Sequence, residues 1–254
     1  LRRCSPFNGG KFEGWGTSFC WWPNRIGYLD ELSEQAAKLF FDPKEGLGLN
    51  IIRYNIGGGD DPTHHHITRT DSMVPGYAIN PSHDANGYHW SYDWNADQNQ
   101  RNVLMKVAEC YGKDLIVEGF SNSPPYFMTN SGCSSGSVNA GENNLREDAY
   151  GAFASYLADV AQHFSKEWGI HFQSMTAMNE PDTEYWHALS DKQEGCHFDP
   201  GESQSVMIIA LREALDERGL NDILISGTDE TGIDCQINSI NSLSEVARET
   251  IARI

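Results

Sequence analysis

Short apolar runs alternate with amphipathic stretches of helical periodicity along this chain, and this alternation limits the possible folds more than any other feature. Five apolar runs are expected to be strands, at residues 15–22, 49–55, 114–120, 172–178 and 222–227. Helical spacing of apolar residues predicts helices over residues 29–41, 98–111, 149–168, 203–218 and 242–254. Nearly continuous apolar runs suit parallel strands that are covered on both faces. The chain is therefore expected to be an α/β protein built from five βα units.

The loops at the two ends of the expected strands differ in length. Long polar loops follow the strands, at residues 57–97, 121–145 and 181–202, whereas the turns after the helices are short. This asymmetry is typical of a TIM barrel, in which the long loops build the active site. A doubly wound open sheet is the alternative, but it usually carries a glycine-rich nucleotide turn after its first strand. Here the three glycines follow the second strand and lead into Asp60 and Asp61, whose charge would repel a phosphate. We therefore predict a (β/α)8 barrel, of which residues 1–254 hold the first five units.

The charge of the chain excludes several classes of partner. A formal net charge of −18 is expected to repel nucleic acid and anionic membrane surfaces, so neither is expected as a partner. No apolar stretch approaches the roughly 18 residues that a membrane-spanning helix needs. The first residues also lack the apolar centre of a signal peptide, so the sequence is interpreted as mature or trimmed. A neutral substrate fits this composition best.

The spacing of cysteines and histidines indicates neither a metal site nor a redox motif. The six cysteines form no zinc ribbon and no CxxC pair. Cys133 and Cys196 lie in polar loops and could pair, which favours an extracellular location, whereas Cys20 and Cys110 lie in apolar segments typical of buried free thiols. The histidines at residues 64–66 are interpreted as solvated or hydrogen-bonded, since no second cluster accompanies them. No metal and no cofactor is expected.

Polar and aromatic side chains follow every expected strand. In chain order they are Trp21 and Trp22; Arg53, Asn55 and Asp60; Ser121, Asn122 and Ser123; Asn179 and Glu180; and Asp229 and Glu230. In a barrel these strand ends meet at one face, so we expect the side chains to share a cleft. Hydroxyl-rich sugars need such donors and acceptors together with flat apolar faces. The sequence therefore predicts a neutral polysaccharide or oligosaccharide as substrate.

Glu180 is the predicted general acid. It comes directly after the apolar run 175–178, beside Asn179, and Pro181 stops further strand pairing. Glycoside hydrolysis normally needs one carboxyl group that protonates the leaving oxygen and a second that acts as nucleophile or base. The alternative is that Glu180 only caps a helix or binds a buried arginine.

Several stretches together resemble glycoside hydrolase family 30, most closely its endo-β-1,6-galactanase branch. The stretches are residues 12–18 (FEGWGTS), 20–22 (CWW), 50–60 (NIIRYNIGGGD), 121–129 (SNSPPYFMT) and 179–181 (NEP). The match spans nearly the whole chain, and the order of the motifs makes it more specific than NEP alone.

The resemblance implies a secreted enzyme that cleaves β-1,6-galactan with retention of configuration, with Glu180 as acid and base. It also implies that Asn179 contacts the sugar 2-hydroxyl and that Arg53 lies beneath the catalytic carboxylates and keeps the nucleophile ionised. Asp60 would bind sugar hydroxyls at the subsite before the scissile bond. A β-sandwich accompanies the barrel in this family, and residues 1–10 are a candidate remnant of it.

The chain also departs from the family pattern. Family members place the nucleophilic glutamate at the end of strand seven, whereas five units already use all 254 residues. The nucleophile is therefore expected beyond Ile254, in a C-terminal segment that would close the barrel, and the chain alone is expected to be inactive and unstable. Glu230 is the local substitute, but its position after strand five favours a binding or structural role.

Two alternatives to the galactanase interpretation stay open: action on another β-glycan (β-1,6-glucan, β-xylan or a glucosylceramide-like glycoside), or a carbohydrate-binding fragment without turnover. Few loop arginines or lysines are available to bind a uronic acid, which favours neutral galactan over glucuronate-decorated xylan. Trp22, Tyr126 and Trp186 are the predicted stacking surfaces for galactose. For Trp22 the alternative is packing in the core.

Overall fold

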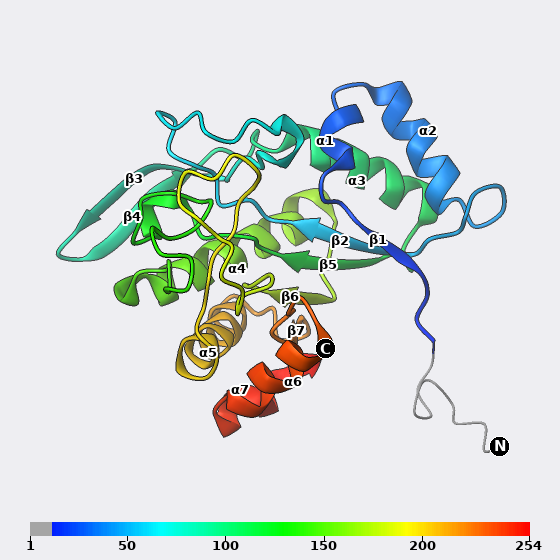
Figure 1. Cartoon of the computed structure of the whole chain (residues 1–254). Coiled ribbons are helices and arrows are strands. Elements are labelled where there is room, and N and C mark those ends of the chain that lie inside the picture. The colour runs from blue at the N-terminus through cyan, green and yellow to red at the C-terminus, as the bar shows by residue number, and fades with distance from the viewer. Residues whose placement is uncertain (1–11) are drawn as a thin grey trace, which may run out of the picture.

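Six parallel strands form one curved sheet at the centre of the molecule (Figure 1). This is a computed structural model, and it describes residues 12–254. In sheet order the strands are β1 (Gly16–Ser18), β2 (Ile51–Asn55), β5 (Ile116–Phe120), β6 (Ser174–Thr176), β7 (Leu224–Ser226) and β8 (Ile251–Arg253). Each strand pairs with the strands before and after it in that order. The five predicted strands are therefore confirmed as the first five of a parallel sheet.

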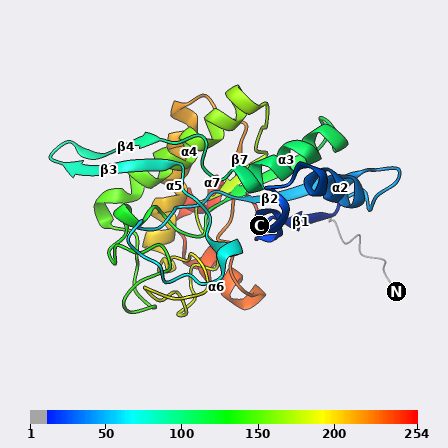
Figure 2. The same ribbon diagram turned by 90° about the horizontal axis from the view of Figure 1, so that it is seen from above.

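Helices lie outside this sheet and fill the connections between its strands (Figures 1 and 2). They are α1 (Trp22–Ile26), α2 (Asp30–Phe41), α3 (Gln98–Tyr111), α4 (Tyr150–Trp168), α5 (Glu202–Glu217), α6 (Ile233–Ser242) and α7 (Glu245–Thr250). Three single 3₁₀ turns occur at Thr70–Ser72, Tyr126–Met128 and Glu147–Ala149. In the outer layer α2 packs beside α3, and α4 packs beside α5. The architecture is α/β with a parallel sheet.

Helix α4 shows why these segments are helical. Its fully buried residues Phe153, Tyr156, Val160 and Phe164 recur every three or four positions, so they form one apolar stripe toward the sheet. The helix stops where Gly169 takes the left-handed conformation, with φ of 68°, which glycine adopts without the steric cost of a Cβ atom. The predicted helix over residues 149–168, with its glycine cap, is thus confirmed.

The core between sheet and helices is aromatic. Tyr54 of β2 packs against Phe164 of α4 and Phe172, with ring centroids 5.2 and 6.2 Å away, and Phe164 also contacts Tyr77 and Trp168. Aromatic pairs at these distances add to the free energy gained from burial alone. Because side chains alternate along a strand, Tyr54 faces the helices while its neighbour Arg53 faces the concave side of the sheet.

The concave side is polar and brings the two ends of the sheet near each other. Arg53 and Glu118 stand opposite each other on β2 and β5. Arg253 of β8 contacts Glu118 Oε1 at 3.4 Å and donates to Oε1 of Glu13, just before β1, at 2.9 Å. Within residues 12–254, however, no strand pairing joins β8 to β1, so the sheet is strongly curved and open.

Two predicted segments differ from the structure. The helix expected over residues 242–254 is wrong: Ser244 starts the short helix α7 by accepting a hydrogen bond from the Ala247 amide, and the chain then extends into β8. A sixth strand is therefore present beyond the five βα units that were expected. The expected loop 57–97 also contains an antiparallel hairpin of β3 (Ala78–Asp84) and β4 (Gly87–Tyr92), which projects at one side of the molecule (Figure 1). The candidate β-sandwich remnant, residues 1–10, lies outside the described residues.

The described cysteines are all free. Cys133 and Cys196, which could have paired according to their loop positions, are separate buried thiols, so that prediction is wrong. Cys20 and Cys110 are free thiols as expected, but both are partly exposed rather than buried. Among residues 12–254, no helix combines the length and the apolar character needed to cross a bilayer.

Asp97 makes the stability of the fold depend on pH. Its buried carboxyl group accepts hydrogen bonds from Tyr54 Oη at 2.5 Å and Gln100 Nε2 at 2.7 Å, and desolvation by burial raises its pKa to about 7. A carboxyl group whose pKa is higher in the folded than in the unfolded protein stabilises the folded state. This stabilisation is largest below the pKa of the group in the unfolded chain, near 4. This contribution is lost as the pH rises through about 7.

We expect Asp97→Asn to flatten the pH dependence of stability. The asparagine keeps the size of the side chain and tolerates the left-handed backbone at this position, where φ is 53°. Between about pH 4 and pH 7 the unfolding free energy of the parent should fall more steeply than that of the variant. The difference in slope should reach up to ~1 kcal/mol per pH unit. Urea unfolding of both proteins across this range measures the difference. Parallel curves would show that the Asp97 carboxyl is not buried in its neutral form.

Candidate active site

The site lies where the loops leave the carboxyl ends of β2, β6 and β7. Arg53, on the concave face of β2, donates from Nη2 to Asn179 Oδ1 at 2.8 Å and forms an ion pair with Asp229. The guanidinium carbon of Arg53 also lies 3.3 Å from the ring centre of Phe120 on β5. Arg53 of β2 thus contacts residues at the ends of β5, β6 and β7. The sequence prediction that Arg53, Asn179 and Asp229 share a cleft is consistent with this geometry.

Glu180 is held in one orientation by its backbone and by one neighbour. It has a left-handed backbone, with φ of 49°, and its amide donates to the Asp229 carbonyl at 2.8 Å. Tyr185 Oη donates to Oε2 of the carboxyl group at 2.6 Å. Among the described residues, no hydrogen-bond partner holds Oε1. The alternative that Glu180 only binds a buried arginine is not what the structure shows, because Arg53 contacts Asn179 and Asp229 instead. A carboxyl group fixed through one oxygen can exchange a proton with a ligand through the other.

Glu230 has a different environment. Its Oε2 accepts from the Asp182 amide at 3.1 Å, and its Oε1 accepts from Ser239 Oγ at 2.6 Å and Gln204 Nε2 at 3.1 Å. Burial raises the pKa of this carboxyl group. Because both oxygens are engaged within the protein, Glu230 joins the loop after β6 to helices α5 and α6. This supports the structural role rather than the role of a nucleophile.

Three predicted sugar-binding side chains lie in the buried floor at the ends of β2 and β5. Ser121 Oγ donates to the Ser123 carbonyl at 2.9 Å. The side-chain amide of Asn55 and Nδ2 of Asn122 have no partner among the described residues. Buried amides without partners are costly, so these groups suit a ligand hydroxyl or a bound water.

The three aromatic residues predicted to stack against galactose differ in their exposure and in their contacts. Trp22 packs edge-on against Phe19 and Phe40 and donates from Nε1 to the Ser18 carbonyl, which favours its core-packing alternative. Trp186 is only 5% exposed, so it presents no open ring face to a sugar. Its Nε1 donates to the Glu180 carbonyl at 3.1 Å, so it supports the Glu180 backbone. Tyr185, which sequence reasoning missed, is 48% exposed beside the Glu180 carboxyl group.

A cavity of about 700 Å³ opens beside these loops. Its lining includes Asp60, Asp61, Tyr126 and Glu194. Glu194, also missed from the sequence, is fully buried beneath the glycine turn and accepts from the Gly59 amide at 2.9 Å. Desolvation raises its pKa to about 8. Of the predicted stacking residues, Tyr126 is therefore the one that lines an open space.

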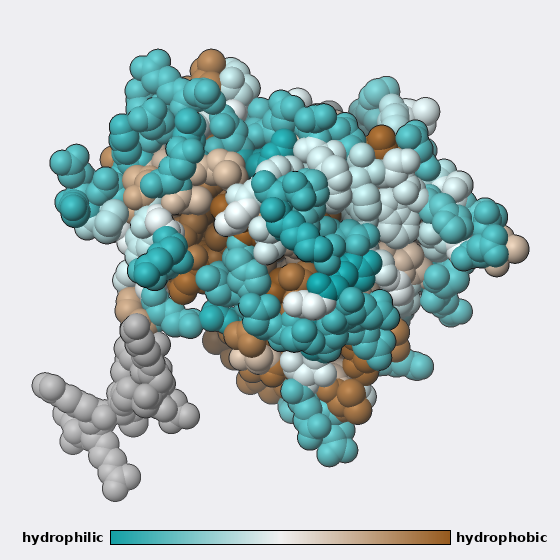
Figure 3. Space-filling view, turned by 180° about the vertical axis from the view of Figure 1, so that it is seen from behind, coloured by the Kyte–Doolittle hydropathy of each residue, from teal (hydrophilic) through white to brown (hydrophobic). Residues whose placement is uncertain are grey.

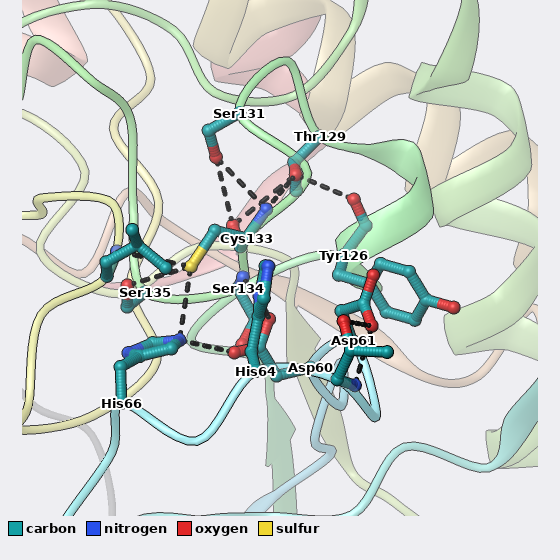
Figure 4. Close-up of polar contacts among 12 residues, drawn as sticks. Asp60, Asp61, His64, His66, Tyr126, Thr129, Ser131, Cys133, Ser134 and Ser135 are labelled. Carbon is teal, nitrogen blue, oxygen red and sulfur yellow. Dashed lines mark hydrogen bonds and ion pairs between the residues drawn. The ribbon is translucent and has the colours of Figure 1, made fainter.

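Asp60 points into a cluster of protein groups (Figure 4). Its Oδ1 accepts from the Ser134 amide at 3.0 Å and lies 3.4 Å from His64 Nδ1, while its Oδ2 lies 2.5 Å from His66 Nε2. Both oxygens of this predicted sugar ligand therefore already have neighbours within the protein.

The loops that carry these groups are tied to the outer helices. Tyr156 of α4 donates from Oη to the Gly57 carbonyl at 2.6 Å and accepts from the Tyr77 amide at 3.1 Å. Both bonds are buried. One hydroxyl thus fixes both ends of the loop that contains Asp60.

Comparisons with known proteins show which family this chain resembles. The model of O-Glycosyl hydrolase family 30 matches residues 12–240. An endo-beta-1,6-galactanase from Hypocrea rufa is 37% identical over 97% of this chain and 52% of its own length. The chain thus spans about half the length of this relative.

Solved structures share the fold. A conserved exported protein from Bacteroides fragilis superposes with a TM-score of 0.73 at 24% identity, covering 88% of this chain and 44% of that one. The catalytic domain of the GH30 xylanase C from Talaromyces cellulolyticus gives a TM-score of 0.69 at 21% identity, covering 95% of this chain and 51% of that one. At these identities the likeness shows the fold alone.

Proposed function

Because the chain belongs to O-glycosyl hydrolase family 30, we propose that it forms the acid/base side of the active site of a retaining β-1,6-galactanase. The observation that carries this proposal is Glu180, which follows Asn179 after β6, while Arg53 of β2 binds the side chain of Asn179. The substrate follows from the relative named as an endo-beta-1,6-galactanase. Since galactan is a polysaccharide outside cells, we propose that the protein is secreted.

In this proposal Glu180 transfers protons on both steps. It first protonates the leaving glycosidic oxygen and later takes a proton from the incoming water. Arg53 holds the amide oxygen of Asn179, so the Nδ2 hydrogens of Asn179 are left to donate to a sugar hydroxyl. The second carboxylate, the nucleophile, is proposed to lie outside residues 1–254, because both oxygens of Glu230 are engaged within the protein.

We also propose that further strands and helices cover the open edge at β8 and complete a (β/α)8 barrel. Apolar side chains are exposed around this edge, at Ile233, Ile237, Val246 and Ile254. A hollow of about 540 Å³ lies among them and is lined partly by three isoleucines of α6. Apolar side chains are visible from behind at the lower part of the molecule (Figure 3). Exposed apolar surface next to an unpaired strand is typically covered in a stable protein.

The substrate is tested by comparing products from three polysaccharides. No arginine or lysine is among the described residues that line the 700 Å³ cavity, whereas Asp60 and Asp61 line it. A uronic acid would therefore meet two aspartates and no arginine or lysine there. Since a hydrogen bond to a charged group contributes about 1.5–3 kcal/mol, we expect neutral galactan to be cleaved at least about tenfold faster than glucuronoxylan.

The protein expressed from its complete reading frame is incubated with debranched arabinogalactan, β-1,6-glucan and glucuronoxylan. Release of β-1,6-galactooligosaccharides from the first substrate alone supports the proposal. Faster cleavage of glucuronoxylan contradicts it. Binding of galactan without any product would favour the alternative, a carbohydrate-binding protein without turnover.

A further inference from the structure

We propose that Asp60, His64, His66 and Cys133 bind a structural zinc ion, which joins the loop after β2 to the loop after β5. One donor atom from each side chain lies within 4.8 Å of those of the other three. Three of the residues come from a single short loop, and Cys133 comes from a second loop (Figure 4). This proposal does not depend on the proposed galactanase activity.

His66 gives the strongest reason to place a cation here. Its Nδ1 lies 2.5 Å from the Ser190 carbonyl oxygen, so Nδ1 must carry a proton. A neutral imidazole then has a lone pair at Nε2, which faces Asp60 Oδ2 at 2.5 Å and Cys133 Sγ at 3.3 Å. Asp60 Oδ2, His66 Nε2 and Cys133 Sγ therefore converge as possible metal ligands. A shared metal ion would be bound by all three of these side chains.

The surrounding groups resemble the outer partners of a metal site. A metal-binding histidine usually donates its other ring nitrogen to a carbonyl, as His66 does to Ser190. The Ser134 amide donates to Asp60 Oδ1 at 3.0 Å and fixes that carboxylate. The Leu189 amide donates to the buried Cys133 sulfur at 3.3 Å and orients it. Each of these three donors to the ion is thus oriented by a backbone group.

The ligand chemistry selects zinc among the common ions. One thiolate, one carboxylate and two neutral imidazoles carry a charge of −2, which a divalent ion balances. Thiolate and imidazole ligands suit zinc and disfavour magnesium or calcium, which prefer oxygen. Zinc binds nitrogen at about 2.0–2.1 Å and sulfur at about 2.3 Å in a tetrahedron. To bind it, the more distant donors would approach one another, while Asp60 Oδ2 and His66 Nε2 would move slightly apart.

Four protein ligands leave no open position, so this zinc has a structural role. The site lies at the edge of the cavity that Asp60 and His64 line. Through Leu189 and Ser190 it also contacts the loop after β6, which carries Glu180. The ion would therefore fix the wall of the cleft by connecting three loops.

The test measures zinc directly. The untagged protein, expressed from its complete reading frame, is stripped with a chelator, titrated with Zn²⁺, and analysed for bound metal after removal of free ions. We expect one zinc per chain. His64→Ala and Cys133→Ser should each weaken Zn²⁺ binding by about 100-fold or more, since changes to outer partners alone cost about 10- to 100-fold. His65→Ala, an exposed neighbour outside the cluster, should bind like the parent.

Replacement by Co²⁺ identifies the ligands independently of enzyme activity. The parent should show the intense visible bands of tetrahedral cobalt and a thiolate charge-transfer band, and Cys133→Ser should lose that band. Cys196→Ser, which changes another buried thiol, should keep it. If Cys133→Ser does not fold, the more exposed His64→Ala carries the comparison.

Absence of bound zinc at excess Zn²⁺ would overturn the proposal. Equal zinc uptake by the parent, His64→Ala and Cys133→Ser would also overturn it. Loss of galactanase activity in the substrate experiment, with zinc still bound, would affect only the proposed function.

Discussion

Replacing Glu180 by glutamine is expected to lower the turnover of β-1,6-galactan by about 10²- to 10⁴-fold, the usual contribution of a general acid. Glutamine has the same shape and can still accept the hydrogen bond from Tyr185 Oη, so the fold and the loop should be unchanged. It cannot donate an acidic proton to the leaving oxygen. The measurement is the kcat of both proteins, expressed from the complete reading frame, with galactan as substrate.

Substrates with activated leaving groups provide a further check on the role of Glu180. They need little protonation, so Glu180→Gln should slow their cleavage much less than that of galactan. Glu184→Gln is the matched control, because Glu184 is exposed on the same loop. It should retain the activity of the parent. Galactan hydrolysis at a near-normal rate by the Glu180 variant would refute the assignment.

Removing the side chain of Phe164 is expected to have the largest effect on stability. Phe164 is completely buried in α4, and its ring contacts Tyr54, Tyr77, Trp168 and Phe172. Phe164→Ala leaves a cavity between α4 and the sheet, and such changes usually cost about 3–5 kcal/mol. Denaturant unfolding, followed by tryptophan fluorescence, should show the midpoint at a much lower concentration.

Leu39→Ala serves as the control for this substitution. Leu39 is 60% exposed on α2, so its truncation should change the unfolding free energy by no more than about 0.5 kcal/mol. Similar losses in the two variants would contradict the packing of α4 described above.

Much of the fold could be predicted from local patterns, and the failures have physical causes. Four helices follow from helical periodicity because each buries one face, as α4 does, and five strands follow from short apolar runs. The helix predicted over residues 242–254 failed because its apolar spacing fits two patterns. Helix α7 ends at Thr250, and Ile251 then pairs with Ile225 of β7, a long-range contact that overrides the local preference.

The candidate site was predictable where it depends on strand ends. Arg53, Asn179 and Asp229 come together because parallel strands deliver their last residues to the same edge. Burial within the loops could not be read from the sequence. In the structure the buried Trp186 donates a hydrogen bond to the Glu180 carbonyl, while its neighbour Tyr185 donates one to the Glu180 carboxyl group.

The cluster around Asp60 shows the same limit. The histidines at residues 64–66 had no second partner in the sequence nearby, and the thiol that meets them, Cys133, lies 67 positions after His66. Only the packing of two long loops against each other reveals that four donor atoms converge.

The bond between Tyr156 and the glycine turn affects how this protein can be engineered. Specificity in barrel enzymes is commonly altered by exchanging a loop, as if each loop were an independent module. Here the hydroxyl of Tyr156, on an outer helix, holds the Gly57 carbonyl and the Tyr77 amide. A loop grafted between these two positions will therefore keep its shape only if it presents the same two backbone groups to that tyrosine. An exchange of this loop should therefore include helix α4 as well.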